Sequence, residues 1–486
     1  MEQLSNPSLF CTKALINGVW KNATSGETFI VTNPASGYPI GKVPNMEQVE
    51  TKEAIDDAEK AFSIWKTYTA GERANFLKKW HQLIIANIED LATILTLEQG
   101  KPIAEAKREI LYGASFIEWF AEEARRVYGD VIPGHTKDTR IIVLKQPIGV
   151  VGAITPWNFP NAMITRKIAP ALAAGCTVVI KPSELTPFSA LAIGKLAEDA
   201  GIPKGVINII TTTKADIVGD ILTTDPLIKK ISFTGSTQIG KLLMKQSASS
   251  VKKVSMELGG NAPFIVFKDA DIDKAVAGAI ASKYRNAGQT CICTNRIFVQ
   301  KEVKAIFTEK YMAAVKNLNV DHGLSDSCDI GPLINQAAIT KVNNLVNNAI
   351  EQGAKLILGG KRHSLGELFY EPTILTNVTA EMNIAKTEIF GPIATLFEFT
   401  SEKEAITLAN DTPYGLAAYF YGNTMSQIWR VAEALDYGMV GINTGNISTP
   451  VAPFGGVKES GIGREGSKYG IDEYVITKYL NFSIEE

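Results

Sequence analysis

Residues 150–184 read VVGAITPWNFPNAMITRKIAPALAAGCTVVIKPSE, and this stretch decides the fold class. Two short runs of β-branched and apolar residues, Val150 to Ile154 and Thr177 to Ile180, are typical of buried strands. Between them, Ala162 to Ala174 has apolar residues at helical spacing. Strand, helix and strand in this order predict a crossover unit of a parallel sheet, whose ligands bind beyond the carboxyl ends of the strands.

The same alternation continues on both sides of this stretch. Further strands are expected at Val206 to Ile210 and Lys230 to Phe233. A helix is expected from Ser189 to Ala200, and Ser183 or Thr186 can cap it. Residues 49–121 are mostly amphipathic helix, which can cover one face of the sheet. The predicted fold class is therefore α/β, with a doubly wound sheet of the nucleotide-binding type.

A second α/β pattern follows Glu257, and two strand-like segments lie outside both patterns. The second pattern begins with a strand at Phe264 to Phe267 and a helix at Ile272 to Tyr284. Residues 131–145 and 473–482 are rich in strand-forming residues but have no obvious partner nearby in the sequence. Such strands have to be covered by another segment or another subunit.

Composition excludes several classes of partner. The 486 residues include 49 basic and 51 acidic side chains, a net charge of −2, without a basic cluster for nucleic acid or an anionic membrane. The uncharged stretches 146–165 and 437–457 contain prolines, so neither is expected to span a bilayer. The first residues match neither a signal nor a transit peptide, and five unevenly spaced cysteines indicate reduced thiols. We expect a cytoplasmic protein with a small-molecule ligand.

Cys291 is the first candidate for chemistry, in the stretch Asn286-Ala-Gly-Gln-Thr-Cys291-Ile-Cys293. A cysteine nucleophile reacts as its thiolate, and a glycine-containing turn that enters a helix would direct backbone N–H dipoles towards it. For an arbitrary cysteine, an inert buried thiol is the commoner case. A metal site at Cys291 and Cys293 is a further alternative, although no other ligand follows at suitable spacing.

Glu257 and Asn158 are the next candidates. Glu257 ends an apolar strand just before two glycines, where partial dehydration can raise its pKa and suit it to act as a general base. Asn158 lies between Pro156 and Pro160, so its amide can be a preorganised donor to an oxyanion. A solvated strand end at Glu257 and a rigid structural turn around Asn158 are the alternatives.

Two further motifs suit a ligand that contains phosphate or ribose. A strand, a glycine turn and a helix meet at Gly235 and Ser236, which favours an anion at the helix N-terminus. Leu242 stands where a P-loop needs a hydroxyl residue, so a nucleoside triphosphatase is disfavoured. Lys181 and Glu184 follow a predicted strand, where they can bind ribose hydroxyls or form a surface ion pair.

Taken together, these motifs resemble the aldehyde dehydrogenase superfamily. The chain has them in the family's order: Pro156-Trp157-Asn158, Lys181-Pro-Ser-Glu184, Phe233-Thr-Gly-Ser236, Glu257-Leu-Gly-Gly260, Gly288-Gln-Thr-Cys291 and Glu388-Ile-Phe390-Gly-Pro392. The resemblance covers about residues 16–480. It implies a Rossmann-type NAD(P)-binding domain (1–125 and 146–256), an α/β catalytic domain (257–455) and a small β oligomerisation arm (126–145 and 456–486).

The resemblance also implies roles for the three candidate residues. Cys291 is expected to attack the aldehyde carbon, and the Asn158 amide and the Cys291 backbone N–H to hold the oxyanion of the thiohemiacetal. After hydride transfer to the nicotinamide, Glu257 is expected to activate the water that hydrolyses the thioester. No motif calls for a metal.

The cofactor contacts implied by the resemblance are Ile154, Pro156, Trp157, Lys181, Glu184, Gly235, Ser236, Leu258, Glu388 and Phe390. Glu388 and Phe390 correspond to the nicotinamide side, and Lys181 and Glu184 to the adenosine side. Because the Glu184 carboxylate can accept both ribose hydroxyls and would repel a 2′-phosphate, NAD is expected to be favoured, with NADP possible.

Within the superfamily, the chain is most similar to the succinate-semialdehyde dehydrogenases. The similar stretches are Asn286 to Cys293, Met163 to Lys167 and Gly463 to Gly470. In that group two arginines and a serine hold the far carboxylate of the substrate, and the matching residues are Arg166, Arg285 and Ser448. The expected reaction is oxidation of succinate semialdehyde to succinate. The alternative substrate is glutarate semialdehyde, or a neutral or cationic aldehyde such as betaine aldehyde. For each arginine, the alternative role is a structural ion pair.

Two further expectations concern regulation and assembly. Thiols separated by one residue can form a strained, reversible disulfide, so Cys293 is expected to act as a redox switch on Cys291. The arm strands imply a homodimer or homotetramer. A catalytically silent binding or structural protein on the same fold is a remote alternative, because such a protein has no need to retain Asn158, Glu257 and Cys291 together.

Overall fold

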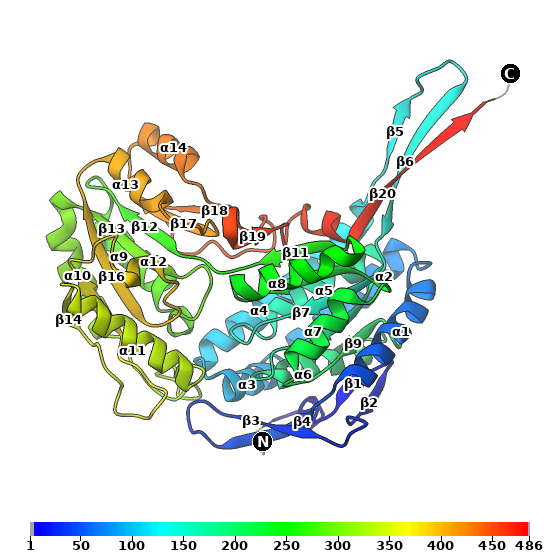
Figure 1. Cartoon of the computed structure of the whole chain (residues 1–486), viewed down its shortest axis with the longest axis horizontal. Helices are drawn as coiled ribbons and strands as arrows, with labels where there is room; N and C mark the ends of the chain where they lie inside the picture. Colours follow the sequence, from blue (N-terminus) through cyan, green and yellow to red (C-terminus); the bar gives the residue numbers. More distant parts are fainter. Residues whose placement is uncertain (1–3, 485–486) are drawn as a thin grey trace.

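The computed structural model describes residues 4–484 and contains two large sheets (Figure 1). The first has eight strands in the order β19 (Gly461–Ile462), β11 (Lys253–Glu257), β10 (Ile228–Thr234), β7 (Val150–Ile154), β8 (Thr177–Lys181), β9 (Ile207–Ile209), β1 (Ala14–Ile16) and β2 (Val19–Lys21). The second has seven, in the order β14 (Lys355–Leu358), β15 (Thr373–Thr376), β16 (Ile393–Phe399), β13 (Thr294–Gln300), β12 (Ala262–Val266), β17 (Ala417–Tyr421) and β18 (Met439–Ile442).

Fourteen α-helices surround these sheets in the described part of the chain. They are α1 (Gln48–Trp65), α2 (Ala70–Ala86), α3 (Ile88–Gln99), α4 (Ile103–Glu123), α5 (Ala162–Ala174), α6 (Pro187–Asp199), α7 (Ala215–Thr224), α8 (Thr237–Ser247), α9 (Ile272–Lys283), α10 (Lys304–Lys316), α11 (Gln336–Glu351), α12 (Asn383–Lys386), α13 (Glu402–Asn410) and α14 (Met425–Ala434). Within residues 4–484, none of the helices combines the length and the apolar character needed to cross a membrane.

The eight-stranded sheet has a hydrophobic core on each face, as the doubly wound prediction requires. Side chains of α1, α7 and α8 pack with alternate strand residues such as Val150 and Ile231 on one face. On the other face α2 to α6 pack with residues such as Val151 and Val178. The predicted α/β fold class is thus confirmed, and β7 and α5 have the predicted bounds. Because both faces are covered, the strands read as continuous apolar runs rather than alternating ones.

The register of the parallel strands places the motifs of the first sheet along one edge. Ile154 pairs with Lys181 across β7 and β8, and with Phe233 across β7 and β10. Thr234 pairs with Glu257 across β10 and β11. The residues that follow these strand ends therefore meet at the same edge of the sheet, where a doubly wound fold binds its ligand.

The predicted cap of α6 is wrong. Thr186 is the N-cap residue, but its side chain makes no capping hydrogen bond, and the Ser183 hydroxyl bonds to Leu185 N instead. Glu98, from the end of α3, accepts the N–H groups of Phe188 at 2.8 Å and Ser189 at 2.7 Å. A carboxylate satisfies two donors and complements the helix dipole, so it replaces a local hydroxyl at this buried end.

The two isolated strand-like segments pair with each other. β20 (Val475–Ser483) runs antiparallel to β6 (Thr139–Pro147), which also pairs with β5 (Asp130–Pro133). This three-stranded sheet extends away from the body of the molecule (Figure 1). A further two-stranded sheet joins β3 (Thr28–Thr32) to β4 (Pro39–Pro44).

Candidate active site

Cys291 lies on a turn between the 3-10 helix η4 (Arg285–Gly288) and β13. We call residues 286–293 the cysteine loop. The expected turn into a helix is wrong, because the chain continues into a strand. Asn286, Ala287 and Gly288 all have left-handed φ values, of 51°, 54° and 74°. A Cβ atom on Gly288 would lie 2.2 Å from the Gly391 carbonyl oxygen, so only glycine fits this close approach.

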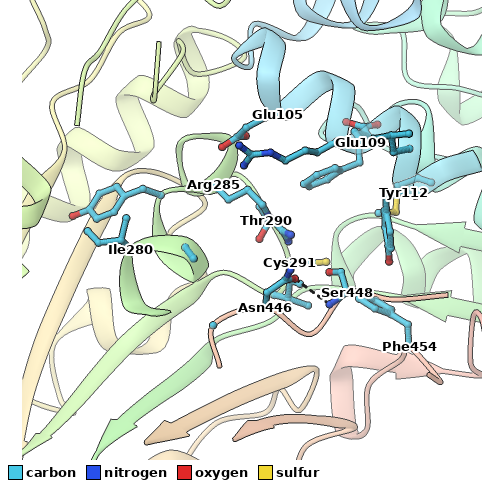
Figure 2. Close-up of a pocket in the computed structure, with 18 of the residues that line it drawn as sticks. Glu105, Glu109, Tyr112, Ile280, Arg285, Thr290, Cys291, Asn446, Ser448 and Phe454 are labelled. Carbon is cyan, nitrogen blue, oxygen red and sulfur yellow. Dashed lines mark hydrogen bonds between the residues drawn. The ribbon is translucent and has the colours of Figure 1, made fainter. Parts of the chain in front are cut away.

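A cavity of about 560 Å³ opens beside Cys291 (Figure 2). It is lined by Arg166 from α5, by Arg285, the residue just before the cysteine loop, and by Ser448 from the segment after β18. The cavity therefore brings together the predicted nucleophile and all three predicted substrate contacts. Tyr112 and Phe454 add aromatic side chains to its wall.

Burial controls the protonation of the Cys291 thiol. It raises the pKa of Cys291 to about 12, and the nearby charge of Arg166 opposes that shift. Glu388 and Glu257 raise the pKa further, so both carboxylates lie within electrostatic range of the sulfur. The resting thiol is therefore protonated, and a reaction through it requires a proton acceptor or a bound ligand that changes this field.

Asn158 is buried and is hydrogen-bonded directly to the cysteine loop. Its amide nitrogen donates to the Gln289 carbonyl at 2.9 Å. Its own carbonyl accepts Asn286 Nδ2 at 2.9 Å and Lys101 Nζ at 2.8 Å. An amide nitrogen carries two N–H groups, so one is left without a partner among residues 4–484.

Glu257 is the last residue of β11 and is 2% exposed. Neither of its carboxylate oxygens has a hydrogen-bond partner among residues 4–484. Burial raises the pKa of Glu257 well above 4.5, and the charge of Glu465 adds to the shift. The solvated strand end is thus not observed, and the environment suits a carboxyl group that exchanges protons near neutral pH.

The two arginines of the cavity have different surroundings. Arg166 Nη2 lies 2.6 Å from Glu465 Oε2, and its guanidinium carbon lies 3.9 Å from the centroid of the Phe454 ring. Arg285 makes no ion pair with any described residue and lies 5.5 Å from the centroid of the Phe159 ring. The structural ion pair considered for both arginines is therefore present at Arg166 alone.

The ten predicted cofactor residues lie after strands or in the loop before β16. Ile154, Pro156, Trp157, Lys181, Glu184, Gly235, Ser236 and Leu258 lie at or just after the carboxyl ends of β7, β8, β10 and β11. Glu388 and Phe390 come from the loop before β16 and reach the same region. The Trp157 and Phe390 rings are edge to face, with centroids 5.7 Å apart. The hydroxyl of Ser236 caps α8 by accepting Ile239 N at 3.4 Å.

Glu388 contacts the glycine pair that follows Glu257. Its Oε1 accepts the Gly260 N–H at 3.0 Å, and burial raises the pKa of Glu388 to about 7. A Cβ atom on Gly259 would meet Glu388 Oε2 at 3.0 Å, and one on Gly260 would meet the Cys291 carbonyl oxygen at 2.3 Å. The two glycines thus allow the Glu388 carboxylate and the cysteine loop to approach the same backbone closely.

Cys293 is buried and is directed away from the cavity. Its sulfur lies 3.4 Å from Lys283 Nζ and donates to the Lys283 carbonyl at 3.4 Å. Burial raises the pKa of Cys293, and the Lys283 charge opposes that shift. All five cysteines are free thiols. The described residues contain no cluster of three or more His, Cys, Asp or Glu side chains placed to bind a metal.

Several residues of the site were not predicted from the sequence. Glu465 pairs with Arg166, Tyr112 lines the cavity, and Lys101 and Glu109 form a buried ion pair beside Asn158. Glu465 follows Arg464 within Gly463 to Gly470. The similarity of that stretch to the succinate-semialdehyde dehydrogenases was a signal that could have identified Glu465. Tyr112, Lys101 and Glu109 lie in residues 49–121, where the sequence pattern predicts only amphipathic helix.

Comparison with known proteins identifies the family of this arrangement. The model of the aldehyde dehydrogenase family matches residues 20–480. The chain belongs to the aldehyde dehydrogenase family. The match includes all residues predicted to take part in catalysis and in cofactor and substrate binding.

Relatives within the aldehyde dehydrogenase family are similar over their full length. The succinate-semialdehyde dehydrogenase [NADP(+)] of Escherichia coli is 58% identical over 98% of this chain and 99% of its own. The glutarate-semialdehyde dehydrogenase of Pseudomonas putida is 57% identical over 99% of this chain and 100% of its own. The crystal structure of succinate-semialdehyde dehydrogenase from Burkholderia pseudomallei has a TM-score of 0.98 and 57% identity, with 99% of this chain and 100% of that chain covered. The resemblance to this group of aldehyde dehydrogenases is thus confirmed.

The expected preference for NAD is wrong. The Escherichia coli aldehyde dehydrogenase, 58% identical, is named for NADP(+). The expectation depended on a fixed, uncompensated carboxylate at Glu184. In the structure that side chain is 42% exposed and pairs with Lys181 at 3.4 Å. A solvent-exposed carboxylate next to a lysine does not exclude a 2′-phosphate, because it can turn towards solvent and leave the ammonium to bind the phosphate.

Proposed function

We propose that this chain oxidises succinate semialdehyde to succinate with NADP⁺, through a thioester on Cys291. The observation that carries the proposal is the shared cavity of Cys291, Arg166, Arg285 and Ser448. An aldehyde at the sulfur can have its far carboxylate beside two cations and a hydroxyl. The name of the Escherichia coli relative supports both the substrate and the cofactor.

The first step is addition of the Cys291 thiolate to the aldehyde carbon. A carbon–sulfur bond forms, and the electron pair of the carbonyl bond moves to its oxygen. The free N–H of the Asn158 amide and the Cys291 backbone N–H stabilise that oxyanion, and loss of one such donor costs roughly 10²–10³-fold in rate. Because burial raises the pKa of Cys291 to about 12, the thiol has to lose its proton to solvent in the cavity before it attacks, and the charge of Arg166 favours the thiolate.

The last step is hydrolysis of the thioester. In its ionised form Glu257 takes a proton from water as the water oxygen attacks the acyl carbon. The carbon–sulfur bond then breaks, the carboxylic acid leaves, and the sulfur is free for the next substrate. Within residues 4–484 neither oxygen of Glu257 has a hydrogen-bond partner, so both are available for that water.

The residues at the sheet edge fit a dinucleotide cofactor. Ser236 begins an eleven-residue helix, whose N-terminus favours a pyrophosphate, and the nearly buried Lys181 suits ribose or a 2′-phosphate. Glu388 and Phe390 would hold the nicotinamide ribose and ring, with Ile154, Pro156, Trp157 and Leu258 beside them. When bound, NADP⁺ supplies the hydride acceptor for the oxidation.

Glutarate semialdehyde is the second candidate substrate. The Pseudomonas putida relative, 57% identical, is named for it. It carries the same carboxylate one methylene further from the aldehyde, and a methylene changes binding by only ~1–3 kcal/mol in a fitted pocket. The same two arginines oppose a cationic substrate such as betaine aldehyde.

One assay tests these assignments. The purified chain is supplied with NADP⁺ and with succinate semialdehyde, glutarate semialdehyde, propanal or betaine aldehyde in turn, and the absorbance of the reduced cofactor is followed. We expect the highest kcat/KM with succinate semialdehyde and little activity with betaine aldehyde. A preference for propanal would reject the arginine site, and full activity of Cys291→Ala would reject the nucleophile.

We further propose a homodimer or homotetramer that assembles through the arm. Its strands expose large apolar side chains, including Val131 (82%) and Tyr479 (58%). Exposed apolar strands are liable to associate, so a second copy of the chain is the natural cover.

The domain limits 1–125 with 146–256, 257–455, and 126–145 with 456–486 stay a prediction. Their ends at 1–3 and 485–486 lie outside the described residues, and β19, within the predicted arm, pairs with β11 of the first sheet. The cytoplasmic location also stays a prediction.

A further inference from the structure

Asn158 lies on an irregular segment, so contacts from elsewhere have to fix its position. β7 ends at Ile154 and α5 begins at Ala162. The Asn158 carbonyl oxygen accepts two buried side-chain donors, Lys101 Nζ at 2.8 Å and Asn286 Nδ2 at 2.9 Å. One donor comes from the turn between α3 and α4, and the other from the cysteine loop.

Lys101 is fully enclosed and is paired with Glu109. Its Nζ lies 2.5 Å from Glu109 Oε2, and the two side chains are 0% and 1% exposed. The ammonium also lies 3.9 Å from the centroid of the Phe159 ring. Burial lowers the pKa of Lys101, and the Glu109 charge opposes that shift. Burying both charges costs their hydration, so such a pair adds little to the stability of the fold. Its main effect is to fix the positions of the groups that it contacts.

Glu109 uses its other oxygen on the same segment. Oε1 accepts the N–H groups of Asn161 at 3.0 Å and Ala162 at 3.2 Å, at the start of α5. A carboxylate is favoured at this end of a helix. The ion pair therefore holds residues 158–162 at both ends, with the ammonium at the Asn158 carbonyl and the carboxylate at the N-terminus of α5.

Asn286 connects this ion pair to the cysteine loop. While its amide nitrogen donates to the Asn158 carbonyl, its amide oxygen accepts Gln99 Nε2 at 3.0 Å. Gln99 Oε1 in turn accepts the Lys101 backbone N–H at 3.0 Å. The Asn158 amide then donates to the Gln289 carbonyl at 2.9 Å. These contacts form a closed buried network that sets the position of Asn158 relative to the loop that carries the nucleophile.

We infer that Lys101 and Glu109 are positioning residues that aim the Asn158 amide at the oxyanion of the thiohemiacetal. The inference rests on the proposed role of Asn158 and assigns the pair an action through that residue rather than on the substrate. A preorganised donor is effective only where charge develops, so a small displacement of residue 158 lowers the rate of chemistry without lowering substrate affinity.

Replacement of Lys101 by Met tests the inference, because it removes the ammonium and keeps the length of the side chain. With succinate semialdehyde and NADP⁺, we expect kcat to fall about 10- to 100-fold, less than or equal to the loss of the oxyanion donor itself. KM should stay within about twofold, and the rate at which iodoacetamide alkylates Cys291 should not change. A general collapse of the site would alter all three quantities.

A double-mutant cycle separates positioning from other effects. In an Asn158→Ala background, Lys101→Met should cause no further loss of kcat, because the amide that it aims is absent. The same fold loss in both backgrounds, or a wild-type kcat in Lys101→Met alone, overturns the inference. Full activity of Asn158→Ala alone instead rejects the proposed role of Asn158, so the two failures are distinguishable.

Two further variants guard against loss of folding. Lys230 is an equally buried lysine that is bonded to Ser255 in β11 and to Glu473 just before β20, so Lys230→Met should lower Tm without changing kcat. If Lys101→Met does not fold, Asn286→Asp removes the second donor to the same carbonyl. Aspartate tolerates the left-handed φ of 51° at this position, and the same fall in kcat with unchanged KM is expected.

Discussion

Arg166 and Glu465 form a buried ion pair at the wall of the cavity, with Nη2 2.6 Å from Oε2. Lys167 Nζ lies 2.5 Å from the other oxygen of the same carboxylate. One carboxylate thus serves two cations, and Glu257, whose pKa is raised well above 4.5, adds less negative charge than an ordinary glutamate. The cluster has an excess of positive charge that the carboxylate of a substrate is suited to balance.

Arg285→Ala is expected to weaken binding of the carboxylate without weakening the fold. Arg285 makes no ion pair with any described residue. Burial raises the pKa of Glu105, and the Lys101 and Arg285 charges oppose that shift. When Arg285 is removed, Glu105 keeps the charge of Lys101 and the Asn286 N–H at 2.8 Å. A hydrogen bond to a charged group contributes ~1.5–3 kcal/mol, so KM for succinate semialdehyde should rise about 10- to 100-fold. KM for propanal should stay the same in steady-state assays.

Arg166→Ala is the matched comparison for this prediction. It leaves Glu465 buried with Lys167 as its remaining partner, so Tm should fall along with affinity. An equal rise in KM for succinate semialdehyde and propanal in Arg285→Ala would argue that this arginine does not read the carboxylate.

Glu257→Gln is expected to separate the two halves of the reaction. The variant should still form the thioester and release reduced cofactor in a burst, and then turn over roughly 10²–10⁴-fold more slowly because no base activates water. In the wild type, kcat should rise with pH through the raised pKa of Glu257, since only the ionised form is a base. Stopped-flow absorbance across a pH series measures both effects, and a variant that retains this rise would contradict the assignment.

The same pKa shift has a consequence for stability. When folding raises the pKa of a carboxyl group, that group stabilises the folded state at pH values below its ordinary pKa of 4.5. This contribution to stability is lost as the pH rises through the raised pKa. Glutamine does not ionise, so the difference in Tm between Glu257→Gln and wild type should increase with pH above about 4.5. Thermal melts in the absence of cofactor give this difference directly.

The parts of the fold that could be predicted from sequence are those with local causes. β7 and α5 have the predicted bounds because each is a continuous run ended by a local signal, such as Gly175 with its left-handed φ of 102° after α5. Long-range contacts have no such signal. Glu98 caps α6 from 90 positions away, and Lys167 and Glu465 are 298 positions apart.

The same distinction applies to the site. The sequence motifs point to Cys291, Arg166, Arg285 and Ser448, and the fold places these residues in one cavity. The strand after Cys291 was not predicted, because a glycine-containing turn can precede either a helix or a strand. Lys101 and Glu109 were not predicted either, since charged residues in an amphipathic segment usually face solvent, whereas here α4 packs against α5 and both side chains are buried.

The redox switch predicts that peroxide inactivates the wild type and that a thiol reductant restores it. Oxidation would join Cys291 and Cys293 and block the nucleophile. Cys293→Ala should remove the reversible part of this inactivation and keep normal kcat, because its sulfur is directed towards Lys283 rather than into the cavity.

Cys176→Ala is the control for that experiment, since Cys176 is equally buried but bonds to the Tyr474 carbonyl in another part of the fold. Its sensitivity to peroxide should equal that of the wild type. Unchanged, reductant-reversible inactivation of Cys293→Ala would reject the switch.

The arm predicts that assembly depends on its apolar surface. Val131 lies on β5 and Tyr479 on β20, and they are among the most exposed large apolar side chains of the arm. Introducing Asp at both positions would require burial of two unpaired charges in any interface that covers the arm, at a cost of several kcal/mol.

We expect light scattering after gel filtration to give a monomer for the double variant and a dimer or tetramer for the wild type. Lys478→Asp exchanges one charge for another on the face of the arm sheet that Val131 shares, so it adds no new charge to an interface and should leave the mass unchanged. An unchanged mass of the double variant would place the interface elsewhere on the molecule.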